Sequence, residues 1–571
     1  MTPDELRADR ESYVSRIVES TSHRRLIVAG PGTGKTTAFA RALDGDSKDN
    51  RVLTFIRNLR AGLEKDLGGK AEVQTLHGFA DHVLHRVGTD GLTASFHYYP
   101  PLPRLLETEI HILTGTESGI RDALSHALHH VEEGEPHLEA YLKAADYYDA
   151  VSHTDAVFRL VLRLRDDHAA IPKHRLVIVD EVQDLSWVEM QLIELLAEHS
   201  PLLLAGDDDQ ALYFRLKFAS ADFIRGMANG GAYERFELPY CSRCTPVVVD
   251  AVQRVISWAV KRGHLKGRLD KPFECFLPDK EEDGKKFPKI KRVLVSAERR
   301  GWDYAGHYVL HQIAAIAPEE ISHSHQENYP TVLIIGPDRF TDGIAAVLEE
   351  AGHSLTRKLA DATADPQLLD GYRFLARNES DRLGWRIVVE VDTLSADQSD
   401  LLVRALKGDE LVDLLPKDYR DKHLSFVRLI AMLAGHVDLA PDQIAGLCDA
   451  VSLSLDEILA SLSAAEPQPK EVDMAKPKIM VTSYVAAKGL SAAHVFVTGL
   501  NVGHLPYRED PTDDEVRQFL VALSRTRKQC HLISCKMYNG RFQKPSPFVQ
   551  LLGSGQVEDV YVDKKYISSL S

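Results

Sequence analysis

The chain has 571 residues, of which 44% are hydrophobic and 27% are charged, and its formal net charge is −16. This length predicts several hydrophobic cores, and the composition is ordinary for a soluble globular protein. No apolar run reaches the ~20 residues of a membrane-spanning helix, and the charged residues 1–25 do not resemble a signal peptide. We therefore expect a cytoplasmic protein with no membrane partner.

The cysteines and the charge exclude further classes of protein. Six cysteines in so long a chain do not make a disulfide framework. Cys241 and Cys244 form a lone CxxC pair without the second pair or the histidines of a structural zinc site, so we expect no structural metal cluster. The acidic net charge argues against a surface covered with nucleic acid, although it allows a narrow basic groove.

Short apolar runs of the β type recur along the chain, with helical stretches between them. Such runs are typical of buried parallel strands, so the sequence predicts an α/β fold with flanking helices. The expected strands are Arg25–Ala29, Arg51–Phe55, Leu176–Val179, Leu202–Ala205, Thr331–Ile335 and His494–Thr498.

Between these strands the sequence predicts two helical insertions, at residues 82–172 and 356–470. Gly384–Asp392 places acidic residues near a strand-like run, but it lacks the lysine that a restriction-type nuclease needs. Two stretches have the composition of linkers: Gly263–Arg292 is rich in Lys, Asp, Gly and Pro, and Ala464–Lys478 contains three prolines.

The first expected strand runs directly into a glycine-rich loop and then a helix, which is the context of a phosphate-binding P-loop. Glycines let successive backbone N–H groups turn toward phosphate oxygens, and the helix N-terminus adds its positive end. Lys35 is expected to reach the β- and γ-phosphates of ATP, and the Thr36 hydroxyl to hold Mg²⁺. The predicted nucleotide contacts are Ala29, Gly30, Pro31, Gly32, Thr33, Gly34, Lys35, Thr36 and Thr37.

Two later strands end in acidic turns that complete a hydrolysis site. Leu176–Val179 delivers Asp180, which is expected to coordinate Mg²⁺, and Glu181, which is expected to orient and deprotonate the attacking water. The next strand leads to Gln210, whose amide both donates and accepts hydrogen bonds. Gln210 is therefore suited to sense the γ-phosphate and to pass its state to Tyr213.

In order and spacing, AGPGTGKT at 29–36, VDEVQD at 179–184 and GDDDQALY at 206–213 resemble motifs of the UvrD-like helicases of superfamily 1. Further segments that resemble the family are VQTLHGFA (73–80, its single-strand segment), Ser242-Arg243-Cys244 (its motif IV arginine), AKGL (487–490, motif V), VALSRTR (521–527, motif VI) and PSPFV (545–549, its closing segment).

The resemblance implies two RecA-like P-loop domains with ATP in the cleft between them. It divides the chain into a first RecA-like domain (1–81 and 173–237), its helical insertion (82–172), a second RecA-like domain (238–355 and 471–571) and a smaller helical accessory insertion (356–470). Carried over by motif, Arg243 and Arg525 would stabilise charge on the transferring phosphoryl group, and Lys488 and Gly489 would contact the nucleotide. The implied nucleic-acid contacts are Thr75, His77, Phe79, Tyr213 and Phe214.

By the same resemblance, the chain would be an ATP-dependent motor that translocates on single-stranded nucleic acid and unwinds DNA from 3′ to 5′, with RNA as an alternative substrate. Full-length members of the family act in DNA repair, and compact UvrD-like helicases also occur beside nucleases in Gabija-type anti-phage systems, so DNA repair and anti-phage defence are both open and a nuclease is a candidate protein partner. A function of another class stays open: a nucleic-acid-sensing ATPase switch that regulates a partner without unwinding.

Three departures from the family's pattern concern the base and the sugar rather than the phosphates. No Gln of the adenine-reading Q motif precedes the P-loop. Ser242 stands where the family has an aromatic residue, and Ser491 stands where it has a ribose-contacting Glu. We therefore expect weak discrimination among nucleobases, with Tyr240 available for stacking and with Arg10 and Arg24 as other candidates for reading the base.

Overall fold

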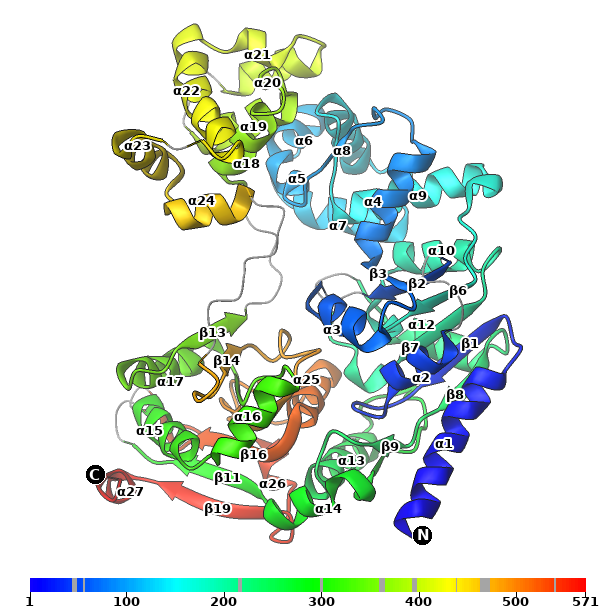
Figure 1. The fold of residues 1–571 in the computed structure, drawn as a ribbon, viewed down its shortest axis with the longest axis vertical. Coiled ribbons are helices and arrows are strands. Elements are labelled where there is room, and N and C mark those ends of the chain that lie inside the picture. Colours follow the sequence, from blue (N-terminus) through cyan, green and yellow to red (C-terminus); the bar gives the residue numbers. More distant parts are fainter. Residues whose placement is uncertain are drawn as a thin grey trace.

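The computed structural model describes residues 1–43, 49–54, 57–213, 218–297, 301–358, 365–392, 398–437, 439–462, 473–538 and 541–570. Two parallel sheets flanked by helices form two lobes, and two further groups of helices lie together at one end of the molecule (Figure 1). This arrangement confirms the α/β fold with two RecA-like domains. Within the described ranges, no helix combines the length and the apolar character needed to cross a membrane.

The first lobe is built on a six-stranded sheet in which the strand pairings are parallel. Successive residues of a strand face opposite sides, so Leu26 and Val28 belong to one core and Ile27 to another. Strands buried on both faces are apolar throughout, which is why the sequence predicted them. In spatial order the strands are β3 (Glu72–Thr75), β2 (Asn50–Thr54), β6 (Leu176–Val179), β7 (Leu202–Gly206), β1 (Arg24–Val28) and β8 (Glu234–Glu237).

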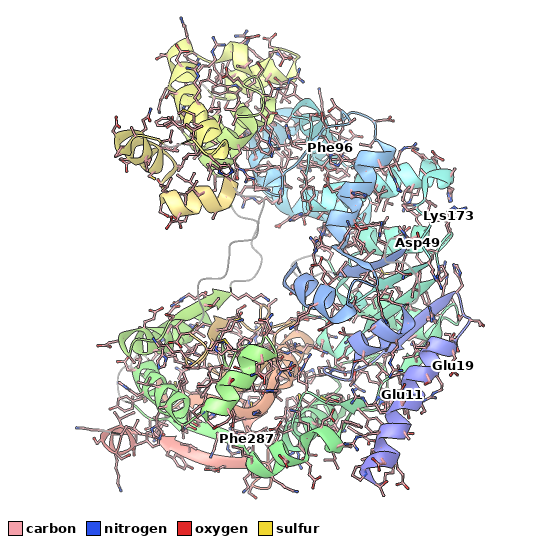
Figure 2. The ribbon with its side chains drawn as sticks, viewed as in Figure 1. Glu11, Glu19, Asp49, Phe96, Lys173 and Phe287 are labelled. Carbon is pink, nitrogen blue, oxygen red and sulfur yellow. The ribbon has the colours of Figure 1, made fainter. Side chains whose placement is uncertain are left out.

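Helices cover both faces of this sheet. One face is covered by α1 (Pro3–Glu19), α2 (Lys35–Ala42) and α3 (Arg57–Leu67). The other face is covered by α4 (Leu76–Val87), α9 (His153–Asp166), α10 (Trp187–Leu196) and α12 (Ala221–Asn229). The first helical insertion adds α5 (Leu102–Leu105), α6 (Glu107–Thr114), α7 (Ile120–His130), α8 (Pro136–Tyr147) and the strand pair β4 (His97–Tyr98) and β5 (Ala150–Val151). Phe96, labelled in Figure 2, is buried there and stacks on His85, with 3.8 Å between the ring centroids.

The second lobe has a seven-stranded parallel sheet with one core on each face. In spatial order its strands are β13 (Leu355–Lys358), β14 (Ile479–Thr482), β12 (Val332–Ile335), β15 (Ala492–Val497), β16 (Thr526–Cys535), β11 (Ile290–Val295) and β19 (Val557–Val562). Its helices are α13 (Pro246–Lys261), α14 (Leu277–Lys286), α15 (Gly301–Ala314), α16 (Pro318–Gln326), α17 (Asp338–Glu350), α25 (Asp513–Ser524), α26 (Pro547–Gln550) and α27 (Lys564–Ser568). A two-stranded pair, β9 (Tyr240–Cys241) and β10 (Glu274–Cys275), lies beside α13.

The second group of helices is inserted between β13 and β14 but packs on the first lobe's insertion rather than on its own sheet (Figure 1). Its members are α18 (Leu368–Leu375), α19 (Arg382–Val391), α20 (Gln398–Leu406), α21 (Leu411–Leu414), α22 (Lys417–Ala434), α23 (Pro441–Val451) and α24 (Leu455–Leu462). Residues of this group and of α4–α9 belong to one continuous hydrophobic core. At its centre Arg386 donates to Glu109 at 2.5 and 3.1 Å, and both side chains are 0% exposed.

Removing one partner of this buried pair is expected to destabilise the joint core strongly. Arg386→Ala leaves the Glu109 carboxylate buried without its cation, so the free energy of unfolding should fall by about 3–5 kcal/mol. Urea denaturation followed by circular dichroism measures it. Arg404, which pairs with Asp409 in the same helical group at 52% exposure of both side chains, is the matched control, and Arg404→Ala should cost less than about 1 kcal/mol. Equal small effects would show that Arg386 does not hold the two helical groups together.

One stretch has a different structure from the one that its composition predicted. Gly263–Arg292 was expected to be a linker, but it contains β10, α14 and the start of β11. Glu281, Glu282, Lys285 and Lys286 of α14 are exposed, while Lys271, Phe273, Phe276 and Lys280 are buried. The run 384–392 lies within the helical insertion expected at 356–470 and forms most of α19, where the Asp381 side chain caps the helix by accepting from the Gly384 N–H at 2.7 Å. Of the expected linker Ala464–Lys478, residues 464–472 lie outside the described ranges.

Candidate active site

A cavity of about 370 Å³ lies between the lobes, at the carboxyl ends of β1, β6 and β7. The first lobe lines it with residues 31–37, Asp180, Glu181 and Gln210. The second lobe contributes Ser242, Arg243, Gly489, Arg525 and Arg527. The structure therefore brings together, around one cavity, candidate residues that lie almost 500 positions apart in the chain.

The P-loop shows why glycine is needed at two of its positions. Gly34 has φ +94° and forms the N-cap of α2, which begins at Lys35, so the helix N-terminus faces the cavity. Gly32 has φ +70°, and a Cβ built there would lie 2.4 Å from the Cβ of Arg243. The Ser242 N–H also donates to the Gly32 carbonyl at 3.0 Å. The second lobe thus packs directly on the P-loop backbone.

The acidic pair follows β6, where the chain turns sharply. Glu181 has φ +58°, its N–H donates to Asp180 Oδ1 at 2.9 Å, and its Oε2 accepts from Gln183 Nε2 at 2.5 Å. Burial and the neighbouring Glu181 carboxylate raise the pKa of Asp180. Burial alone would raise the pKa of the Glu181 carboxyl, but the positive charges of Lys35 and Lys488 outweigh burial and lower this pKa. Glu181 is therefore the ionised member of the pair, as a group that takes a proton from water must be.

The buried Arg525 reaches across to the first lobe. Its Nη2 donates to Gln210 Oε1 at 2.8 Å, while its Nε and Nη1 donate to the carbonyls of Val521 and Leu490 at 3.0 and 3.1 Å. Burial and the nearby charge of Arg243 lower the pKa of Arg525 to about 9. An anion placed between the two arginines relieves this repulsion, so the cavity favours a polyphosphate.

The other predicted nucleotide contacts are placed beside the cavity. The Lys488 ammonium contacts Asp184, the Gln210 carbonyl at 2.6 Å and Glu181 at 3.6 Å, and its neighbour Gly489 lines the cavity. The Ala29 N–H donates to the carbonyl of Gly206 at 3.1 Å, which joins the ends of β1 and β7. Gly30 packs so closely against Phe273 that a Cβ at position 30 would lie 2.6 Å from the Phe273 ring. These residues shape the loop and hold the lobes together.

Three of the candidate nucleic-acid contacts, Thr75, His77 and Phe79, do not line this cavity. Thr75 caps α4, its Oγ1 accepting from the Gly78 N–H at 3.1 Å. His77 lies 3.3 Å from Glu189, and Phe79 is 1% exposed and packed in the first lobe's core. Tyr213 lies near the cavity, with the Lys488 ammonium 5.8 Å from its ring centroid. Phe214 lies outside the described residues.

A second cavity of about 260 Å³ adjoins the first and shares Arg10, Thr33, Gly34 and Thr37 with it. Its rings are Tyr13, Tyr240 and Phe276. The acids and cations around it are already paired: Arg10 with Asp279 at 3.4 Å, Glu11 with Arg41 at 2.8 Å, and the Tyr240 hydroxyl with Asp9 at 2.6 Å. Figure 2 labels Glu11 and Glu19 on α1, which runs along this edge of the first lobe. Arg24 is bound elsewhere, to Glu194 at 2.5 Å.

Sequence reasoning missed two kinds of site residue. Arg527 lines the main cavity two residues after Arg525, where its Nε donates to Ser491 Oγ at 2.9 Å, and the motif itself could have pointed to it. Tyr13 and Phe276 carried no signal, because rings spaced irregularly along a chain usually belong to a core. They meet only because α1 and β10 fold against the same side of the P-loop.

The donor set also fits a divalent cation. Thr36 and Asp180 both line the cavity, and a hydroxyl and a carboxylate are hard oxygen ligands of the kind that Mg²⁺ prefers. With a helix N-terminus and four arginines around the same space, the cavity can bind a triphosphate and neutralise charge on it.

Together, the two parallel-sheet lobes and this cavity indicate a P-loop ATPase. A family model described as an AAA domain matches residues 15–215, which include the end of α1, the P-loop, the acidic pair and Gln210. Domains of this kind are found in UvrD/Rep-like superfamily 1 helicases, and the match supports that superfamily. No curated protein matches the chain.

Proposed function

We propose that the chain is an ATP-driven motor that moves along single-stranded nucleic acid and unwinds DNA. One observation carries the proposal: a single cavity is lined by the general base and P-loop of one lobe and by the arginines of the other. Because Arg243 and Arg525 complete the site only when the lobes are closed, each cycle of ATP binding and hydrolysis couples chemistry to lobe movement. Lys35 binds the phosphates, Thr36 and Asp180 hold Mg²⁺, and Glu181 accepts the proton of the attacking water.

Strand separation tests this proposal. Fluorescently labelled duplexes with a 3′ or a 5′ single-stranded tail are mixed with the protein, ATP and Mg²⁺. We expect ATP-dependent unwinding of the 3′-tailed duplex only, and none with Lys35→Ala, which lacks the phosphate-binding ammonium. Unwinding of the 5′-tailed duplex alone would contradict the proposed polarity.

A strand-sensing ATPase that regulates a partner, such as a nuclease, is the second candidate function. It is favoured by the joint core of the two helical groups, because α18–α24 belong in sequence to the second lobe and pack on the first. This packing connects the two lobes, so it restrains large movements of one lobe relative to the other. In the same assay, ATP hydrolysis stimulated by a single strand without unwinding of either duplex would identify this function.

We expect the protein to accept several nucleoside triphosphates. The second cavity offers rings for stacking, while Arg10 and Asp279 in its lining pair with each other and Glu11 pairs with Arg41. A site that holds the base by stacking discriminates weakly, so GTP and CTP should support turnover within about tenfold of ATP, a gap of ~1.4 kcal/mol.

Steady-state kinetics with the four nucleoside triphosphates measure this preference. Phe276→Leu should raise the KM for all four to the same degree, because stacking does not depend on the identity of the base. A preference for ATP of a thousandfold or more would show that the adenine edge is read by hydrogen bonds.

A further inference from the structure

The segment 265–273, here called the crossing segment, leaves the second lobe and returns to it. Leu265 is buried in the core of the second lobe, Leu269 in the core of the first, and Phe273 again in the core of the second. The chain between α13 and β10 therefore enters the first lobe in its middle. There it meets the acidic turn that follows β7.

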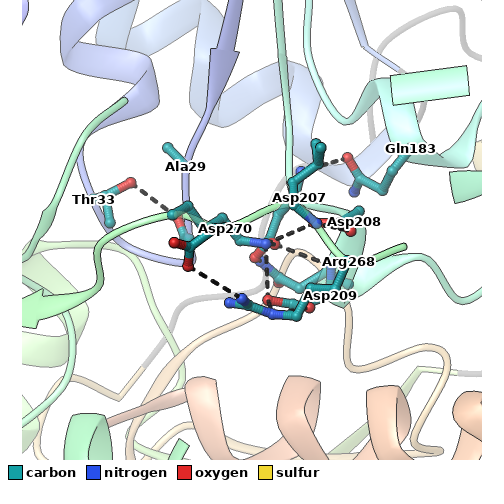
Figure 3. A network of polar contacts seen from close by, with 12 residues as sticks. Ala29, Thr33, Gln183, Asp207, Asp208, Asp209, Arg268 and Asp270 are labelled. Atoms are coloured by element: carbon teal, nitrogen blue, oxygen red, sulfur yellow. Dashed lines mark hydrogen bonds and ion pairs between the residues drawn. The ribbon is translucent and has the colours of Figure 1, made fainter. Parts of the chain in front are cut away.

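Lys271 of the crossing segment lies among the three carboxylates of this turn. Its Nζ is 2.9 Å from Asp207, 2.7 Å from Asp208 and 2.8 Å from Asp209, and its side chain is 3% exposed. Figure 3 shows the three aspartates close together, with Arg268 bonded to Asp209. Arg268 Nε contacts both oxygens of Asp209 at 2.9 Å.

The three carboxylates of the turn after β7 are spaced as in a cation site, and the ammonium of Lys271 is the cation that they hold. Carboxylate oxygens of Asp207, Asp208 and Asp209 lie within 4.8 Å of one another. The ammonium of Lys271 is within hydrogen-bonding distance of all three. Although burial lowers the pKa of Lys271, the three carboxylates outweigh burial and raise it, so the lysine stays charged.

Asp207 connects Lys271 to the candidate active site. Asp207 Oδ1 contacts the Lys271 ammonium, and Asp207 Oδ2 accepts a hydrogen bond from Gln210 Nε2 at 2.6 Å. The Gln210 amide is thereby oriented, because its nitrogen faces Asp207 and its oxygen accepts from Arg525 at 2.8 Å. The Asp207 N–H also donates to Gln183 Oε1 at 3.0 Å, and Gln183 donates to Glu181.

We propose that Lys271 is a positioning residue for ATP hydrolysis: by holding Asp207 ionised and in place, it fixes the Gln210 amide with its oxygen toward Arg525. An ionised carboxylate accepts hydrogen bonds only, so it admits the amide nitrogen and excludes the flipped amide. Lys271 lines neither nucleotide cavity and acts through Asp207 and Gln210. Because Lys271 belongs to the crossing segment, a residue of the second lobe fixes the orientation of Gln210 in the first lobe. The inference rests on the proposed ATPase function.

Lys271→Met is expected to lower kcat for strand-stimulated ATP hydrolysis by about 10- to 100-fold, the range for a partner that orients a site residue, while KM changes less than about threefold. Arg268→Met is the matched control, because Arg268 lies in the same segment and pairs with Asp209 rather than with Asp207, the carboxylate that accepts from Gln210. Its kcat should stay within about threefold of wild type.

A double variant separates positioning from stability. In a Gln210→Ala background, Lys271→Met should lower kcat by less than about twofold further, because the group that it positions is absent. The double variant Asp208→Asn/Lys271→Met has the same net charge as the wild-type cluster. It replaces Lys271→Met in the kcat measurement if Lys271→Met alone unfolds. It should lose kcat as Lys271→Met does and melt closer to wild type.

Three results would overturn the inference: a wild-type kcat in Lys271→Met or in the charge-matched variant, an undiminished loss in the Gln210→Ala background, or an equal loss of kcat in Arg268→Met. The failure of the proposed function is distinct from these, because wild-type protein would then hydrolyse no ATP with Mg²⁺ and a single-stranded oligonucleotide present. That outcome would overturn both.

Discussion

Glu181→Gln is expected to bind ATP with nearly unchanged affinity and to lose its hydrolysis. The amide keeps the shape of the side chain but cannot take a proton from water, and loss of a general base lowers the rate by ~10²–10⁴-fold. The local geometry should survive, because the Glu181 N–H bond to Asp180 is made by the backbone. Single-turnover hydrolysis and equilibrium binding of ATP, measured on the same preparation, separate the two effects.

Lys35→Ala is the comparison for this variant, since it should lose binding as well as hydrolysis. Hydrolysis by Glu181→Gln at the wild-type rate would show that another group, or water alone, accepts the proton.

Arg525→Lys and Arg243→Ala are expected to lower kcat far more than nucleotide affinity. An arginine that neutralises charge on the transferring phosphoryl group is worth ~10³–10⁵ in rate, because that charge grows in the transition state. Lysine at position 525 keeps the charge but not the planar fork that reaches Gln210 and two carbonyls at once. Comparison of kcat with the dissociation constant of ATP measures the effect.

Arg292→Ala is a control outside the cavity, where Arg292 of β11 pairs with Asp559 of the edge strand β19. It should leave both quantities unchanged. A weaker affinity for ATP in Arg525→Lys and Arg243→Ala, with kcat at the wild-type value, would show that the two arginines only hold the ground state.

The parts of the structure that the sequence predicted best are local. Six expected strands match β1, β2, β6, β7, β12 and β15 to within one or two residues, because strands buried on both faces are continuous apolar runs. The P-loop and the acidic pair were predicted for the same reason: each follows directly from the strand that carries it.

The parts that the sequence could not predict depend on contacts between distant segments. Lys271 and Asp208 lie 63 residues apart, and nothing in the polar stretch 263–292 distinguishes this lysine from its neighbours. The β-branched run of α19 lies in the region expected to be helical, but the burial of Trp385, Ile387, Val388 and Val389, which outweighs the run's intrinsic preference for strand, depends on partners elsewhere in the chain. Likewise, the core shared by the two helical groups depends on the meeting of Arg386 and Glu109, 277 positions apart.

We propose that the cavity between the lobes is an ATPase site activated by a single strand. The most direct test of this proposal is steady-state ATP hydrolysis with and without Mg²⁺ and a single-stranded oligonucleotide, in wild type and in Lys35→Ala. We expect hydrolysis that requires Mg²⁺, increases when the strand is added and disappears in Lys35→Ala. A rate of ATP hydrolysis that does not change when the oligonucleotide is added, or that persists in Lys35→Ala, would show that the cavity is not such a site.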